Sequence, residues 1–308
     1  MPIDPQLVEL LSLMPEDLFV GDAPTARATI AAGMGLMPVV TPLPHVEDRT
    51  ITTAPHGVEL PVRVYRPCDE PGLPVTVFLH GGGFVIGGPD THDGLARLVA
   101  RHADCVVVSV DYRLAPEFPF PAATEDAFAA YLWVREHAAE LGGDPDRIAI
   151  AGDSAGATLS ATTCLMVRDQ GVPQPVLQML WYPATGVEDT PSRVENANAP
   201  LLTADSIAWF TAHHHGGRTL ESLGPYARIG TFADLSGLAP AHVVVAGHDP
   251  LRDEGALYAE RLREAGNTVE LERYDDMVHG FMTFVDLVPR CAECARGSFA
   301  ALHRALHP

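Results

Sequence analysis

The chain has 308 residues, of which 47% are hydrophobic, so it can bury a large core and intrinsic disorder is not expected. Acidic residues outnumber basic ones 40 to 20, and this formal charge of −20 argues against binding to nucleic acids or to anionic membrane surfaces. All the basic residues are arginine, which excludes mechanisms that need a lysine amine, such as a pyridoxal Schiff base.

From residue 75 onward, short β-branched runs alternate with amphipathic stretches, which predicts an α/β fold. Several runs are continuously apolar, as is typical of strands covered on both faces, so we expect a mostly parallel, eight-stranded sheet flanked by helices. The expected strands are 46–53, 59–66, 75–79, 105–111, 147–151, 176–182, 241–247 and 268–274. The expected helices are 91–103, 122–141, 155–170, 252–266 and 281–306.

Two segments fall outside this alternation. Residues 1–45 are expected to be helical and then Pro-rich, and residues 185–222 separate two predicted strands by more than an ordinary connection. We interpret residues 1–45 as the N-terminal part of a cap over a site and residues 185–222 as its inserted part. The core would then comprise residues 46–184 and 223–308.

The strongest chemical signal is a G-x-S-x-G sequence, Gly152 to Gly156, between a predicted strand and an Ala-rich helical stretch. A nucleophilic serine on a sharp strand-to-helix turn needs small residues two positions away on each side, where strand and helix pass closely. The pattern also occurs by chance in ordinary Gly-rich turns, but its context favours Ser154 as a nucleophile. The helix N-terminus behind it favours developing negative charge.

A second glycine-rich motif, His80 to Phe84, follows the predicted strand 75–79. Consecutive glycines present backbone N–H groups to a ligand oxygen without side-chain obstruction, which is the chemistry of an oxyanion hole. A flexible glycine loop without chemistry is the alternative. Its position upstream of Ser154 favours the oxyanion hole.

A serine nucleophile needs a base, and the base needs an acid that orients it. Among the 14 histidines, His279 stands just after the last predicted strand, where α/β enzymes place catalytic groups. Asp249 follows the preceding predicted strand. The order Ser154, Asp249, His279 is the order expected of a triad on an α/β-hydrolase fold.

Three further acidic residues compete with Asp249 for the role of the orienting acid. Asp253 falls where a helix is expected to begin, and interaction with the helix N-terminus explains it more simply. Asp275 and Asp276 are too close to His279 along the chain to come from the preceding strand's loop. We therefore assign the role to Asp249.

With these motifs in place, the sequence resembles the hormone-sensitive-lipase-like family of serine esterases, the bacterial family IV carboxylesterases. The motifs are spread in family order across residues 75–285. They are HGGGF, YRLAPE (Tyr112 to Glu117), GDSAG, DPLRDEG (Asp249 to Gly255) and HGF.

The resemblance implies an α/β-hydrolase fold with a helical cap and a Ser-His-Asp triad. It also implies that backbone N–H groups form the oxyanion hole. One departure is Ala157, where the family commonly has glycine. By this resemblance the triad is Ser154, Asp249 and His279, and the oxyanion hole is Gly82, Gly83 and Ala155.

These residues together indicate a serine carboxylesterase that forms an acyl-enzyme, and the resemblance suggests short- to medium-chain acyl esters as substrates. An amide, lactone or carbamate hydrolase is an alternative, because the same triad serves all three and the cap and pocket choose the substrate. A non-catalytic small-molecule receptor on the same fold is a second alternative, against which His279 in an intact HGF motif argues.

No metal and no cofactor are expected, and the expected partner is a small-molecule ester. The resemblance also suggests a homodimer. An acidic N-terminus without a basic stretch does not resemble a signal peptide. The two longest stretches free of Asp, Glu and Arg are interrupted by prolines, so neither is expected to form a membrane-spanning helix. Five scattered cysteines fit reduced thiols rather than a disulfide framework, so we expect a cytoplasmic location.

Other features have simpler interpretations. His213 to His215 cannot all face one metal ion from a helix, so we expect a polar cap surface there. Tyr112, Arg113 and Glu117 are expected to hold a loop beside the site through buried polar contacts. Trp209 and Phe210 are interpreted as the apolar core of the cap, with substrate contact as the alternative.

Overall fold

The computed structural model describes residues 1–14, 19, 21–34, 40–53 and 57–308. Parts of the expected N-terminal cap segment, including Glu16, Asp17 and Pro38, therefore lie outside the described residues. Along the described residues, no helix combines the length and the apolar character needed to cross a membrane.

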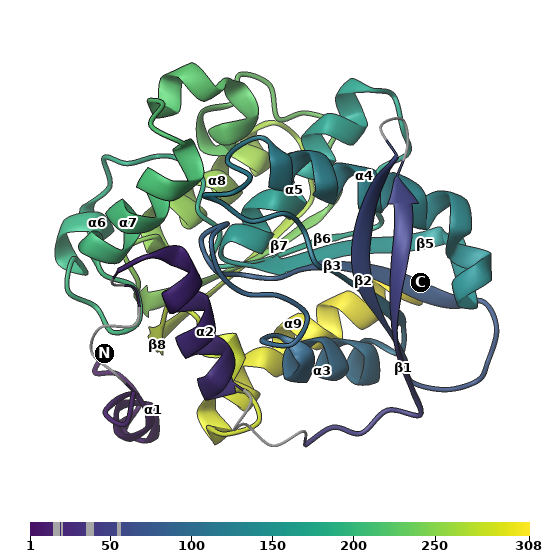
Figure 1. The fold of residues 1–308 in the computed structure, drawn as a ribbon, viewed down its shortest axis with the longest axis horizontal. Helices are drawn as coiled ribbons and strands as arrows, with labels where there is room; N and C mark the ends of the chain where they lie inside the picture. The colour runs from purple at the N-terminus through teal and green to yellow at the C-terminus, as the bar shows by residue number, and fades with distance from the viewer. Residues whose placement is uncertain (15–18, 20, 35–39, 54–56) are drawn as a thin grey trace.

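One eight-stranded sheet forms the middle of the molecule (Figure 1). Its strands in chain order are β1 (His45–Thr53), β2 (Val58–Arg66), β3 (Leu73–Leu79), β4 (Val106–Val110), β5 (Gly143–Asp153), β6 (Gln178–Trp181), β7 (Ala241–His248) and β8 (Val269–Val278). The spatial order is β1-β2-β4-β3-β5-β6-β7-β8. β2 pairs antiparallel with β1 and β4, and all other neighbours are parallel. All eight expected strands are present, and the predicted fold class is confirmed.

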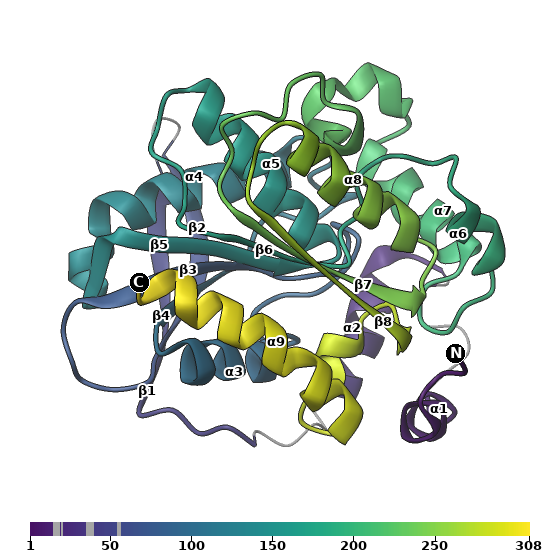
Figure 2. The same cartoon turned by 180° about the vertical axis from the view of Figure 1, so that it is seen from behind.

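Helices cover both faces of the sheet, as two opposite views show (Figures 1 and 2). α3 (Asp93–Ala103) and α9 (Pro289–Leu306) cover one face, and α4 (Ala122–His137), α5 (Ala155–Asp169) and α8 (Arg252–Glu264) cover the other. Every residue of β3 and β4 is buried, as expected for strands between two helix layers. Alternate β3 side chains pack into the two separate apolar clusters that these layers form.

The last expected helix differs from the structure. Residues 281–306 form a short 3-10 helix, η5 (Phe281–Phe284), and then α9, which begins at Pro289. Proline has no N–H and disfavours helical backbone at the residue before it, and Val288 is accordingly extended, with φ −117° and ψ 113°. A single helix across this proline was therefore wrong.

The two segments outside the alternation contain short helices. The N-terminal segment holds α1 (Pro5–Leu11) and α2 (Ala23–Met34), and the connection between β6 and β7 holds α6 (Pro191–Glu195) and α7 (Ala204–His215). Both views place α2, α6 and α7 near the end of the sheet toward which β7 and β8 run (Figures 1 and 2). The two segments thus lie at the end where loops follow parallel strands.

Candidate active site

Ser154 lies on a sharp turn between β5 and α5. Its backbone has φ 53° and ψ −117°, a conformation that residues other than glycine rarely adopt. Gly152 and Gly156 allow this turn: a Cβ on Gly152 would collide with the backbone of Gly156, and a Cβ on Gly156 would collide with the carbonyl of Leu79. The two glycines of the motif therefore permit the close passage of strand and helix that the sequence predicts.

His279 links Ser154 to Asp249 through two hydrogen bonds. Its Nε2 lies 2.9 Å from Ser154 Oγ, and its Nδ1 lies 2.8 Å from Asp249 Oδ2. Asp249 follows the end of β7 and His279 follows the end of β8, so neighbouring parallel strands bring both to one edge of the sheet. Both side chains are buried, while Ser154 is half-buried. This is the geometry of a nucleophile, a base and an orienting acid.

The competing acidic residues have other partners. β8 continues past the expected end at residue 274, so Asp275 and Asp276 lie in the strand. Asp253 lies in the first turn of α8, as expected. The partners are Arg252 and the N–H of Ser192 for Asp253, Arg273 for Asp275 and Arg290 for Asp276.

The loop after β3 carries two glycines with left-handed backbone, Gly82 with φ 121° and Gly83 with φ 59°. A Cβ on Gly82 would collide with the carbonyl of Ile86, and a Cβ on Gly83 would collide with the ring of Phe210. Within the described part of the chain, the N–H groups of Gly82, Gly83 and Ala155 donate to no protein acceptor. All three residues line one cavity, so their N–H groups are available to a substrate oxygen.

A buried carboxylate beside the nucleophile holds the start of this glycine loop. Asp153 Oδ1 accepts the N–H of Gly81 at 2.8 Å and lies 3.3 Å from Nε2 of His92. Burial disfavours ionisation of Asp153, but the charge and hydrogen bond of His92 and the Gly81 N–H outweigh it and lower the pKa. Neither Asp153 nor His92 was predicted from sequence. An acidic residue inside the G-x-S-x-G motif is the one local signal for this contact.

Of the residues expected to make buried contacts, Tyr112 does so and Glu117 does not. The buried Tyr112 hydroxyl donates to the carbonyl of His80 at 2.7 Å and so holds the glycine loop, as expected. Glu117 is exposed, and its carboxylate pairs with Arg27 of α2 at 2.7 Å. The expected buried contact is wrong for Glu117, because its partner belongs to the N-terminal segment, which no local pattern connects to this loop.

A mainly apolar cavity of about 470 Å³ adjoins Ser154 and His279. Both segments outside the core alternation contribute to its wall, for example through Ile30 from α2 and Phe210 from α7. Phe210 also packs with Phe19, with ring centroids 4.9 Å apart. Phe210 is therefore both part of an apolar cluster and part of the cavity wall.

The three adjacent histidines of α7 do not form a uniformly polar surface. His214 is buried and stacks on Phe84, with ring centroids 3.9 Å apart. Burial lowers the pKa of His214 to about 3, which leaves the imidazole neutral. The expected polar surface is wrong at this residue, since one of three consecutive helical positions points inward. Among the residues with described placement, no three His, Cys, Asp or Glu side chains gather as metal ligands.

Comparison with known proteins identifies the class. A family model described as the alpha/beta hydrolase fold matches residues 76–283, which is more than half of the chain, so the chain belongs to the α/β-hydrolase fold family. Within that fold, the relatives and solved structures below are esterases, which confirms the predicted hormone-sensitive-lipase-like family and the predicted class of carboxylic-ester hydrolase.

Three relatives carry this assignment. Carboxylesterase NlhH of Mycobacterium tuberculosis is 46% identical over 99% of this chain and 97% of that protein. Esterase LipI of the same species is 42% identical over 99% of this chain and 96% of its own length. The structure of a hyperthermophilic esterase from the archaeon Pyrobaculum calidifontis superposes with a TM-score of 0.93 and 41% identity, covering 99% of both chains.

Proposed function

We propose that this protein is a serine carboxylesterase in which Ser154 is the nucleophile, His279 the general base and Asp249 the acid that orients it. The observation that carries the proposal is the unbroken hydrogen-bond chain from Asp249 through His279 to Ser154 at the wall of a mainly apolar cavity. A serine hydroxyl is a weak nucleophile until an adjacent base takes its proton. The names of the relatives agree with the reaction class.

The reaction proceeds through an acyl-enzyme. His279 Nε2 takes the proton of Ser154 as Oγ attacks the ester carbonyl, and Asp249 stabilises the imidazolium that forms. Collapse of the tetrahedral intermediate breaks the bond to the alkoxy oxygen, which leaves as the alcohol with the proton from His279. Water then attacks the acyl group with the same assistance, releases the acid and restores Ser154.

The N–H groups of Gly82, Gly83 and Ala155 form the oxyanion hole of this proposal. The negative charge develops on the former carbonyl oxygen only in the transition state, so donors fixed in advance stabilise that state most. The left-handed glycine backbone and the Asp153 contact to Gly81 support a preset loop. Ala155 adds a donor at the N-terminus of α5, where the helix dipole favours negative charge.

The proposed substrates are short- to medium-chain acyl esters. A cavity of about 470 Å³ with a mainly apolar wall is of the size that holds small ligands. We propose that residues 1–45 and 185–222 form the cap and that residues 46–184 and 223–308 form the catalytic core. Contributions of both segments to the cavity wall support the cap assignment.

We also propose a cytoplasmic location and a homodimer. All five cysteines are free thiols, which suits a reducing compartment. β8 is the last strand at one edge of the sheet, and such an edge can pair with a second copy. Sedimentation of the purified protein measures the assembly.

Replacement of the nucleophile tests the proposal. Ser154→Ala should lower kcat for an aryl acetate by on the order of 10⁶-fold, because the triad acts as a unit. Ser160→Ala is the matched control: Ser160 lies in α5, directly after the Ser154 turn, and its hydroxyl donates to the carbonyl of Gly156 at 2.8 Å, its one partner among the described residues. A fluorophosphonate should label the parent and the control but not Ser154→Ala. Retention of a tenth of the activity in Ser154→Ala would refute the assignment.

The alternative activities are separated by substrate. An aryl acetate and the anilide with the same acyl group, together with a small lactone and an aryl carbamate, compare the reaction classes, and the proposal expects the highest kcat/KM for the aryl acetate. Saturable binding of the esters without turnover would favour the receptor. The ester series from acetate to laurate then measures the chain-length preference.

A further inference from the structure

The loop that carries Asp249 is held by residues of the inserted segment. The loop leaves β7 at His248 and enters α8 at Arg252, and its backbone carbonyls need donors because the region is buried. Locally, Asp249 Oδ1 accepts the N–H of Leu251 at 2.7 Å. This bond fixes the carboxylate relative to its own loop but does not fix the loop relative to His279.

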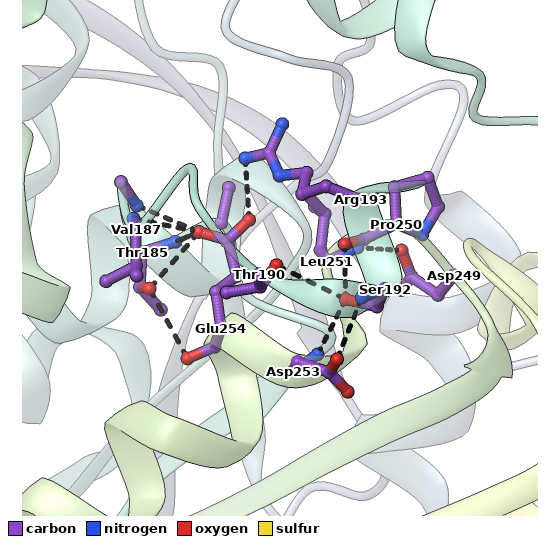
Figure 3. Close-up of polar contacts among 12 residues, drawn as sticks. Thr185, Val187, Thr190, Ser192, Arg193, Asp249, Pro250, Leu251, Asp253 and Glu254 are labelled. Atoms are coloured by element: carbon purple, nitrogen blue, oxygen red, sulfur yellow. Dashed lines mark hydrogen bonds and ion pairs between the residues drawn. The ribbon is translucent and has the colours of Figure 1, made fainter. Parts of the chain in front are cut away.

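Two side chains of the inserted segment donate to backbone carbonyls of this loop, and Figure 3 shows the one from Ser192. Ser192 Oγ, on α6, donates to the carbonyl of Pro250 at 2.8 Å. Asn196 Nδ2, just after α6, donates to the carbonyl of Asp249 at 3.2 Å and lies 3.5 Å from that of Gly247. The carbonyl of Asp249 accepts the N–H of Arg252 locally at 3.1 Å, and Asn196 adds a second donor from outside the loop.

Ser192 and Asp253 exchange two hydrogen bonds, one in each direction, which fixes the orientation of Ser192 relative to the start of α8. The N–H of Asp253 donates to Ser192 Oγ at 3.1 Å, and the N–H of Ser192 donates to Asp253 Oδ2 at 2.8 Å (Figure 3). Ser192 is fully buried. One serine therefore satisfies a carbonyl and an N–H on either side of the turn from Asp249 into α8.

A second group of contacts, around Glu254, joins α6 to α8. Glu254, fully buried on α8, accepts the N–H groups of Thr185 and Gly186 at 2.9 and 3.0 Å and pairs with Arg193 of α6 at 2.7 Å (Figure 3). Glu254 of α8 therefore binds the inserted segment at two places, at its start (residues 185–186) and in α6. α6 can then act as a fixed support for the acid loop.

We propose that Ser192 and Asn196 are positioning residues for Asp249, so that the inserted segment sets the place of the catalytic acid as well as bounding the cavity. The inference rests on the proposed function, in which Asp249 orients His279. A shift of about 1 Å in a supporting group can cost about 100-fold in rate, so loss of these donors should reduce turnover without removing any reacting group.

A double-mutant cycle on the full chain separates positioning from a merely structural role. Ser192→Ala/Asn196→Leu should lower kcat for an aryl acetate by about 10- to 100-fold, with KM within about twofold. Asp249→Asn alone should lower kcat by about 10⁴-fold. Added to Asp249→Asn, the pair of substitutions should have almost no further effect, because there is no longer a correctly placed acid to lose.

Two variants make the result specific. Ser192→Thr keeps the hydroxyl and should retain most of kcat, whereas Ser192→Ala should not. Thr203→Val is the matched control from the same segment: it removes the N-cap of α7, where Thr203 Oγ1 accepts the N–H of Ser206 at 3.0 Å, without touching the acid loop. It should leave kcat within about twofold. Circular dichroism melting checks that each variant is folded, and the single Asn196→Leu variant replaces the pair if the pair does not fold.

The outcomes are distinguishable. Near-normal kcat in Asp249→Asn would overturn the proposed function itself. A collapse in Asp249→Asn, together with an unchanged kcat in the Ser192 and Asn196 variants, would overturn only the positioning role. An equal fractional loss in both backgrounds would also overturn it, because the loss would then not act through Asp249.

Discussion

The glycine loop after β3 is the part of the site in which a single atom matters most. Gly82 has φ 121°, and a Cβ there would meet the carbonyl oxygen of Ile86, which is backbone and cannot turn aside. The N–H groups of Ile86 and Val85 both donate to the Gly82 carbonyl at 3.0 Å, so this turn is closely fixed. A side chain at Gly82 must therefore move the loop.

We expect Gly82→Ala to lower kcat by about 100-fold or more with little change in KM, since the donors meet the oxyanion only in the transition state. Steady-state kinetics on an aryl acetate measure both constants. Gly94→Ala is the control: Gly94 lies in α3, and a Cβ there has no atom closer than 3.7 Å. An effect confined to KM would mean that the loop shapes the cavity and does not bind the oxyanion.

At this scale, local patterns determine which residues can be found from sequence. Ser154 is marked by glycines on both sides, and Asp249 and His279 each follow a predicted strand, so the proximity of the three residues could be predicted. Ser192 and Asn196 reach the acid loop from a segment far along the chain, and their side chains bond to backbone carbonyls. Backbone partners leave no mark in the sequence, so these contacts could not be predicted.

The carboxylate of Glu254 joins α8 to α6 and to the start of the inserted segment. Among the described residues, the hydrogen-bond partners of the Glu254 side chain are all donors, which suits an ionised carboxylate. Burial raises the pKa of Glu254 against the opposing effects of Arg193 and the backbone N–H groups. Removal of its charge leaves Arg193 without its partner in a mostly buried position.

Glu254→Gln should lower the free energy of unfolding by about 2 kcal/mol, less than for a fully buried pair because Arg193 is partly exposed. Urea denaturation measures this change. Glu260→Gln, on the exposed side of the same helix, should change it by less than about 0.5 kcal/mol. Equal effects of the two substitutions would contradict the role given to the Glu254 contacts.

The strands and helices could be predicted from sequence where the spacing of hydrophobic residues and the length of the segment indicate the same type of element. The central strands β3, β4 and β7 are nearly continuous apolar runs, which distinguishes them from the amphipathic helices. The errors fall where that signal ends: β8 continues through Asp275 and Asp276, which lie at an irregularity between Tyr274 and Val278, and pairing with β7 resumes at Val278. The break before α9 comes from Pro289, and the spacing of hydrophobic residues gives no sign of it.

Over the whole molecule, the N-terminal segment and the insertion meet although they are far apart in sequence. Trp209 Nε1 of α7 donates to the carbonyl of Gly21 at 3.0 Å. On the core side, Arg27 of α2 donates to the carbonyls of Val85 and Ala115 at 2.7 and 2.6 Å. The N-terminal segment therefore contacts both the insertion and the loop that continues from the glycine motif.

Removal of residues 1–44, up to the start of β1, should shift the substrate preference toward longer acyl chains. Leu13, Phe19 and Ile30 line the cavity, and their loss opens one wall and admits water. The ratio of kcat/KM for an aryl laurate to that for the acetate should rise by about tenfold, the rate equivalent of roughly 1.4 kcal/mol. The rise should come mainly from the longer esters, because Ser154, His279 and Asp249 all lie outside the deleted part.

The deletion also exposes apolar surface that Leu7 and Ala26 now bury against the core, so aggregation can obscure the kinetics. Phe19→Ala/Ile30→Ala enlarges the cavity at the same wall while the backbone of the segment stays in place. It should shift the acyl-chain preference in the same direction as the deletion. Thr29→Ala is its matched control within the cavity wall, since its hydroxyl bonds to the carbonyl of Thr25 and little apolar volume is lost. An unchanged acyl profile in both the deletion and the double variant would show that the N-terminal segment does not bound the acyl site, whatever its contribution to stability.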